Sequence, residues 1–114
     1  MASIIAQPLP FQPSTSLILV AEDEPEIATQ IARRLEAEGW RVHTVGDGVA
    51  GVEAEASVRP DLVVLDVMLP GIDGLEVCRR IQAHGAADNR STPPVLMLTA
   101  RDDETDLLIG LGVG

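Results

Sequence analysis

The sequence predicts a single α/β domain in which helices cover both faces of a parallel β-sheet, a doubly wound arrangement of three layers. The chain has 114 residues, enough for one domain with a substantial core. Hydrophobic residues make up 46% of it but aromatic residues only 2%, which favours aliphatic α/β layers. Short apolar runs alternate with helical patterns, and this alternation predicts right-handed crossovers between parallel strands.

Four strands are predicted from short runs of apolar or β-branched residues. Residues 17–21 and 61–66 are dominated by aliphatic side chains, as expected for strands that are covered on both faces. Residues 41–45 alternate in polarity and contain β-branched side chains, and residues 94–100 form the last of the four apolar runs.

The first two helices are predicted from start and stop signals. One begins at Pro25, because a first helical turn does not need the missing N–H, and ends at Gly39. Its apolar stripe is predicted to consist of Ile27, Ala28, Ile31, Ala32 and Leu35. The other begins at residues 47–48. Its buried side is predicted to consist of Val49, Val52 and Ala56.

Two more helices are predicted in the second half of the chain. The third follows Asp73, whose side chain can cap its first turn. Its apolar face is predicted to consist of Leu75, Val77, Cys78 and Ile81. A polar connection at residues 86–92 leads to the last strand, and residues 102–111 are predicted as a fourth helix with its leucines facing inward.

The charge of the chain limits its partners. Eighteen acidic residues against eight basic residues give a net charge of -10, so direct binding of nucleic acid by this chain is not expected. The same surface suits a cation, or a protein partner that presents a basic patch.

Targeting signals are not evident in the sequence. The longest apolar runs are far shorter than the roughly 20 residues of a membrane-spanning helix, and the N-terminus lacks a signal-peptide pattern. The single cysteine, Cys78, permits a reducing environment, and a cytoplasmic location is expected. Residues 1–16 are rich in proline and polar residues and are predicted as a flexible tail, so that the domain comprises residues 17–114.

Polar residues gather at the predicted carboxyl ends of three strands. Glu22 and Asp23 follow the first strand, Asp66 ends the third, and Thr99 lies at the end of the fourth. In a parallel sheet the functional crevice lies beyond these ends. Clustered carboxylates repel one another, and a hard cation such as Mg²⁺, which prefers oxygen ligands, relieves this repulsion. A carboxylate can also attack phosphorus to form an acyl phosphate, and the Thr99 hydroxyl could donate to a phosphoryl oxygen.

Three sequence blocks resemble the receiver domain of two-component response regulators. The blocks are residues 18–25, 62–74 and 94–100. The middle block is the most specific, because its aspartate, proline and glycines stand at the family's spacing, and the similarity runs from about residue 17 to residue 114. The resemblance implies a flavodoxin-like fold with strand order 2-1-3-4, from which the family's fifth strand and fifth helix are expected to be missing.

The resemblance also implies roles for individual residues. A histidine kinase would be the partner that donates a phosphoryl group to Asp66, in a protein that is a phosphoacceptor and not an enzyme. Glu22 and Asp23 would form an acidic pair, with Asp23 as a direct ligand of Mg²⁺ or Mn²⁺. Met68 would offer its backbone carbonyl to the metal, and Thr99 would be the switch hydroxyl. Similar family members carry a DNA-binding winged-helix domain downstream, which implies a role in transcription regulation.

The sequence departs from the family pattern in two respects. The family has a lysine at the end of a fifth strand and an aromatic residue on that strand, whereas this sequence contains no lysine and reaches Gly114 before either position. We therefore expect weak phosphorylation of Asp66 and poor coupling to a surface change. We also expect residues 95–98 to form an exposed apolar edge, through which, or through the fourth helix, two copies could form a homodimer.

Other function classes fit the sequence less well. A non-switching module that binds a kinase or another receiver without productive phosphorylation is the alternative that the missing lysine favours. A hydrolase of the haloacid-dehalogenase type needs a second aspartate two residues after the nucleophile, where Met68 stands. His43 and His84 have no metal-ligand spacing and are interpreted as structural or surface residues, and Trp40 as a packing residue.

Overall fold

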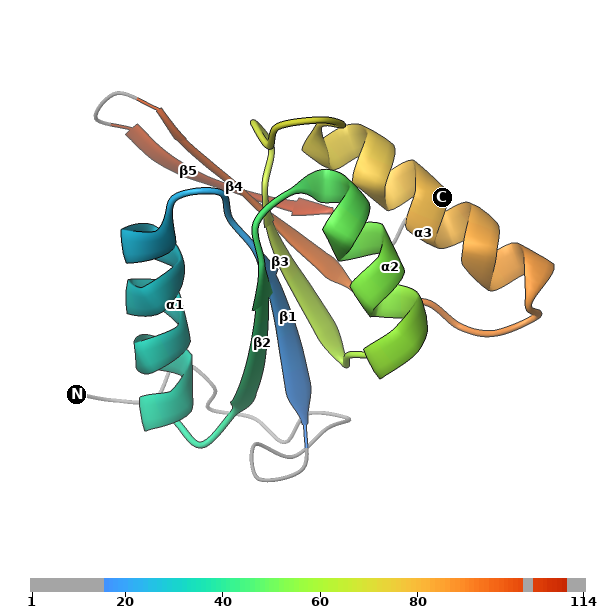
Figure 1. Cartoon of the computed structure of the whole chain (residues 1–114), viewed down its shortest axis with the longest axis horizontal. Coiled ribbons are helices and arrows are strands. Elements are labelled where there is room, and N and C mark those ends of the chain that lie inside the picture. Colours follow the sequence, from blue (N-terminus) through green and yellow to red (C-terminus); the bar gives the residue numbers. More distant parts are fainter. Residues whose placement is uncertain (1–15, 102–103, 111–114) are drawn as a thin grey trace.

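The computed structural model describes residues 16–101 and 104–110, and only the backbone from residue 99 onward. One sheet contains five strands in the order β2-β1-β3-β4-β5 (Figure 1). The strands are β1 (Leu17–Ala21), β2 (Arg41–Val45), β3 (Leu62–Asp66), β4 (Val95–Arg101) and β5 (Glu104–Gly110). The helices are α1 (Pro25–Ala37), α2 (Gly48–Val58) and α3 (Gly74–Ala87). The first four strands are parallel, which confirms the predicted order 2-1-3-4.

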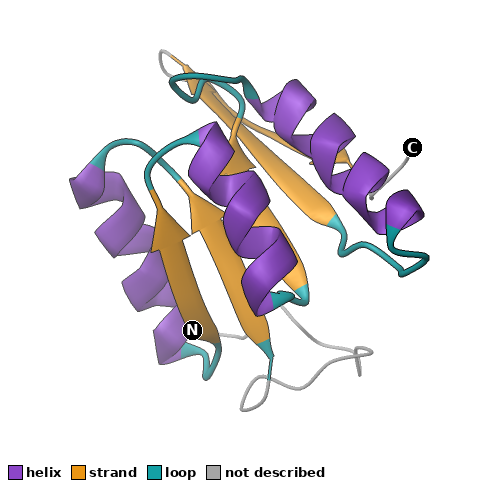
Figure 2. Cartoon of the chain, turned by 45° about the vertical axis from the view of Figure 1, so that its right-hand side comes forward, coloured by secondary structure: helices purple, strands orange, loops and turns teal. Residues whose placement is uncertain are grey.

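The helices lie in two layers, one on each face of the sheet (Figure 2). On β1, the buried side chains of Ile18 and Val20 belong to one hydrophobic cluster, and those of Leu19 and Ala21 to another. The first cluster includes Ile31 and Leu35 of α1, whereas the second includes residues of α2 and α3. The near-continuous apolar character of β1 follows from this burial on both faces.

Helix ends follow the local signals in the sequence. Gly39, just past α1, has a φ of 98°, a conformation that favours glycine. The Asp47 carboxylate accepts a hydrogen bond from Ala50 N–H at 2.7 Å, and that of Asp73 accepts one from Glu76 N–H at 2.9 Å. Both aspartates therefore act as N-caps of the helices that follow them.

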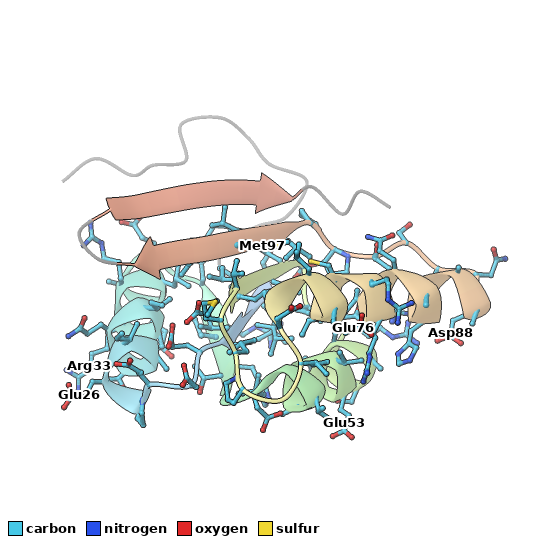
Figure 3. All side chains as sticks on the ribbon, turned by 90° about the horizontal axis from the view of Figure 1, so that it is seen from above. Glu26, Arg33, Glu53, Glu76, Asp88 and Met97 are labelled. Atoms are coloured by element: carbon cyan, nitrogen blue, oxygen red, sulfur yellow. The ribbon has the colours of Figure 1, made fainter. Side chains whose placement is uncertain are left out.

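Two of the three residues predicted on the buried side of α2 are exposed, so that prediction was wrong for Val49 and Ala56. Val49 is 43% exposed, and Ala56 is exposed as well. The buried residues of α2 are Gly48, Gly51, Val52, Ala54 and Glu55. Leu75 of α3 and Ile27 of α1 are also exposed. Charged side chains such as Glu26, Arg33, Glu53 and Asp88 project away from the sheet, whereas Met97 lies on the α3 side of β4 (Figure 3).

The predicted fourth helix at residues 102–111 was wrong, because Glu104–Gly110 forms strand β5. This strand pairs antiparallel with β4 along its whole length, from Val95 opposite Gly110 to Arg101 opposite Glu104. Pairing satisfies the backbone N–H and C=O groups that an unpaired β4 would expose, a gain that local helical spacing does not reveal. The edge of β4 that was expected to be exposed is therefore covered by β5, and the homodimer stays a prediction.

The predicted tail lies almost wholly outside the described residues. Of its sixteen positions only Ser16 is described; it is buried, and its carbonyl accepts a hydrogen bond from Arg41 N–H at 3.1 Å. Within the described ranges, none of the helices has the length and apolar character needed to cross a membrane.

Candidate functional site

The end of β1 brings two acidic residues to the carboxyl edge of the sheet. Glu22 N–H donates to the Val45 carbonyl at 3.0 Å, so pairing between β1 and β2 continues to this point. The Glu22 side chain is buried, and its Oε2 accepts a hydrogen bond from Glu24 N–H at 3.1 Å. Asp23 is exposed, just before α1 begins at Pro25. The pair therefore has one carboxylate fixed beneath the surface and one that faces solvent.

Asp66 is the last residue of β3 and is half-buried. Its Oδ1 accepts a hydrogen bond from Met68 N–H at 3.0 Å, which restricts rotation of the carboxylate. Val67 N–H donates to the Leu98 carbonyl at 3.2 Å, and Gly74 N–H donates to the Val67 carbonyl at 2.9 Å. The loop between β3 and α3 is thus closed at its base directly beside Asp66.

The three carboxylates converge. One oxygen each of Glu22, Asp23 and Asp66 lies within 4.8 Å of the other two. Burial raises the pKa of Glu22, the hydrogen bond from Glu24 N–H opposes this, and the negative charges of Asp66 and Asp23 raise the pKa further. The cluster is therefore under electrostatic repulsion, and a cation would relieve it.

A hollow of about 440 Å³ lies over these carboxylates. It is lined by Glu22, Asp23, Glu24, Ile27, Asp66, Met68 and Leu98. Ile27 and Met68 are both exposed, so the acidic floor has a partly apolar rim. The sequence did not mark Ile27 and Leu98 as site residues, although Ile27 stands in the helical turn directly after the acidic pair.

The predicted site residues are brought together to different degrees. The structure places Glu22, Asp23 and Asp66 in one cluster, with the Met68 backbone bound to Asp66. Thr99 lies on β4, one residue after Leu98, which is the register partner of Asp66. The Thr99 side chain lies outside the described part of the chain. His43 and His84 are exposed and belong to none of the acidic or metal-binding groups found among the described residues.

Comparisons with known proteins give a consistent result. Residues 18–114 match the family model described as the response regulator receiver domain. The transcriptional regulatory protein TcrA of Mycobacterium tuberculosis is 52% identical over 97 residues, which are 85% of this chain and 36% of that protein. The chain spans about two fifths of the length of the curated relatives it matches.

Solved structures agree with this match. The N-terminal domain of a response regulator receiver protein from Methanoculleus marisnigri superposes with a TM-score of 0.69 at 38% identity, covering 80% of this chain and 72% of that one. The response regulator TrrA from Thermotoga maritima, solved in complex with Mg²⁺ and BeF, gives a TM-score of 0.68 at 33% identity, with 77% and 72% coverage.

Proposed function

We propose that Asp66 is the phosphoryl-accepting residue of this chain, which belongs to the response regulator receiver domain family. Phosphorylation by a histidine kinase is the function of that family. The observation that carries the proposal is the convergence of Glu22, Asp23 and Asp66 within 4.8 Å at the carboxyl ends of β1 and β3. A lone aspartate at a strand end is often only a helix cap, but a cap does not need two further carboxylates beside it.

The proposed reaction is an in-line displacement at phosphorus. A carboxylate oxygen of Asp66 forms a bond to phosphorus while the bond from phosphorus to the donor's imidazole nitrogen breaks, and the electron pair goes to that nitrogen. The hydrogen bond from Met68 N–H to Oδ1 holds the carboxylate in one orientation before reaction. This preorganisation lowers the entropic part of the barrier.

The residues around Asp66 fit a divalent cation, Mg²⁺ or Mn²⁺. Three carboxylates supply hard oxygen donors. The pKa of Glu22 is raised first by burial and further by the negative charges of Asp66 and Asp23, and a cation would offset those charges. In our proposal Asp23, Asp66 and the Met68 carbonyl hold the ion, with Glu22 beside them. When bound, the cation would screen the anionic nucleophile from the anionic phosphoryl group.

Two further roles belong to the same proposal. Thr99 would donate its hydroxyl to a phosphoryl oxygen, which is supported by its place one residue after the register partner of Asp66. A histidine kinase would dock over the hollow, because the exposed side chains of Ile27 and Met68 offer apolar contact and the acidic residues suit a basic partner.

The output of phosphorylation is proposed from the relatives. The curated relatives are named as transcriptional regulatory proteins, so we propose that this receiver takes part in transcription regulation. We also propose a cytoplasmic location, which the single cysteine permits. The net charge of -10 argues that this chain itself does not contact nucleic acid. The second candidate function is a non-switching interaction module, which would bind a kinase or another receiver without productive phosphorylation.

Intact-mass measurement after incubation with Mg²⁺ and acetyl phosphate tests the proposal. We expect one added phosphoryl group in the unchanged chain and none in Asp66→Asn. Asp73→Asn is the matched control, because Asp73 lies on the same loop and asparagine is an equally good N-cap. An adduct that persists in Asp66→Asn would refute the assignment, and no adduct in the unchanged chain would favour the interaction module.

A further inference from the structure

The first turn of α2 lies directly against the loop between β3 and α3. Gly48, the first residue of α2, is buried. A Cβ atom placed on Gly48 would lie 2.5 Å from the Ile72 carbonyl oxygen, 2.6 Å from Ile72 Cγ1 and 3.0 Å from Val77 Cγ2. The nearest of these atoms belongs to the backbone, so a change of rotamer cannot relieve the clash. Any side chain at position 48 must therefore displace the loop or the helix.

The loop has little freedom to absorb such a displacement. At its base, Gly74 N–H donates to the Val67 carbonyl at 2.9 Å. A Cβ atom on Gly74 would lie 2.9 Å from Val67 Cα and 3.1 Å from the Asp66 carbonyl oxygen, so this end is also in close contact with β3. Between the two ends, Leu69 is buried in the hydrophobic cluster that α2 and α3 share. Movement at Ile72 is therefore passed on to the residues that follow Asp66.

We propose that Gly48 is a positioning residue for the cation site. Its lack of a side chain lets α2 approach Ile72, and this approach sets the position of the Met68 carbonyl and of the Met68 N–H that holds Asp66. Gly48 itself is not among the residues that line the hollow over the carboxylates, so it acts through the loop. This inference rests on the proposed function, because it concerns the cation that Glu22, Asp23 and Asp66 would hold.

Gly51, one turn further along α2, provides a matched control. A Cβ atom on Gly51 would lie 3.7 Å from Ala21 Cβ and 3.9 Å from Val45 Cγ2, which is ordinary van der Waals contact. Alanine is the better helix former at both positions. Gly48→Ala and Gly51→Ala therefore each add one methyl group at a buried position of the same helix, and only the first presses on the loop.

The test is calorimetric titration of the full chain with Mg²⁺, together with the melting temperature and the NMR shift of the Met68 amide in metal-free protein. We expect Gly48→Ala to bind Mg²⁺ about tenfold more weakly, the lower end of what losing support behind a metal ligand causes. We also expect its Met68 amide signal to move, while Gly51→Ala matches the unchanged chain in both respects. Equal Mg²⁺ affinity and an unmoved Met68 signal in a folded Gly48→Ala would overturn the inference.

Two further outcomes are also decisive. If Gly48→Ala does not fold, Ile72→Ala removes the side-chain half of the contact without adding volume. It must then move the Met68 signal and weaken Mg²⁺ binding, and unchanged behaviour would overturn the inference. If the unchanged chain does not bind Mg²⁺, the proposed cation site fails, whereas the Met68 signal in Gly48→Ala still decides whether Gly48 positions the loop.

Discussion

A buried ion pair joins α2 to the connection between α3 and β4, and removal of one partner should strongly destabilise the domain. Arg90 donates from both terminal nitrogens to the two carboxylate oxygens of Glu55, each at 2.8 Å. The side chain of Glu55 is 0% exposed and that of Arg90 is 13% exposed. Arg90→Leu would therefore leave a carboxylate in the interior with no compensating charge.

The magnitude of the loss follows from the burial of the pair. Removing one partner of a buried ion pair costs about 3–5 kcal/mol, because the other charge stays buried and uncompensated. We therefore expect Arg90→Leu to lower the free energy of unfolding by about 3–5 kcal/mol at pH 7.

Urea unfolding followed by the fluorescence of Trp40, which is buried, measures these differences. Arg79→Leu is the control, since Arg79 pairs with Glu76 at the surface, with side chains 68% and 30% exposed, and should cost less than about 1 kcal/mol. Replacing both Glu55 and Arg90 by leucine should recover most of the loss. The reasoning is refuted if Arg90→Leu matches Arg79→Leu, or if the double variant is no more stable than Arg90→Leu.

Two other predictions concern single carboxylates. Burial and the charges of Asp66 and Asp23 raise the pKa of Glu22, so metal-free protein should lose stability as pH rises through that raised pKa. Urea unfolding without cation at several pH values should show this decline in the unchanged chain, and a decline of equal size in Glu22→Gln would contradict it. Asp47→Ala removes the cap on Ala50 N–H and should lower the unfolding free energy by about 1 kcal/mol, whereas Asp47→Asn, measured in the same way, should lower it much less.

The sequence was sufficient to predict the four parallel strands because burial on both faces leaves a strong local pattern. The residues of α2 were harder to interpret for the opposite reason. Its buried face includes Glu55, a residue type that normally marks a solvent-exposed face, and the partner that permits this burial, Arg90, lies 35 positions away. No window along the helix contains that partner, so Val49 was wrongly assigned to the interior instead.

The region after β4 shows a second limit of local patterns. Leucines in residues 102–111 have helical spacing, yet Glu104–Gly110 adopts an extended conformation beside β4. Thr105 and Ile109 are β-branched and are compatible with a strand. The local sequence therefore favours neither helix nor strand clearly. The unpaired edge of β4 then decides the outcome, and that edge exists only once the sheet has assembled.

The candidate site was predictable where it depends on topology. Parallel strands that start in register also end in register, so Glu22, Asp23 and Asp66 must meet once the strand order is known. The contact between Gly48 and Ile72 was not predictable in this way, because it joins a helix to a loop across a distance that no strand pairing sets.

Helix α2 is therefore tied to its neighbours at two points that differ in physical character. Gly48 contacts the loop beside Asp66 by steric fit, whereas Glu55 is held to Arg90 by charge. The two points are separated by about 10 Å of helix, at a rise of about 1.5 Å per residue. A change in the steric contact can shift the loop with little effect on stability. Loss of a charge partner lowers stability, because the remaining buried charge is uncompensated whatever the position of the helix. If α2 transmitted displacement along its length, Arg90→Leu would also weaken Mg²⁺ binding. If the two contacts are independent, Arg90→Leu should leave Mg²⁺ binding unchanged. The effects of Arg90→Leu and Gly48→Ala on the free energy of unfolding should then add.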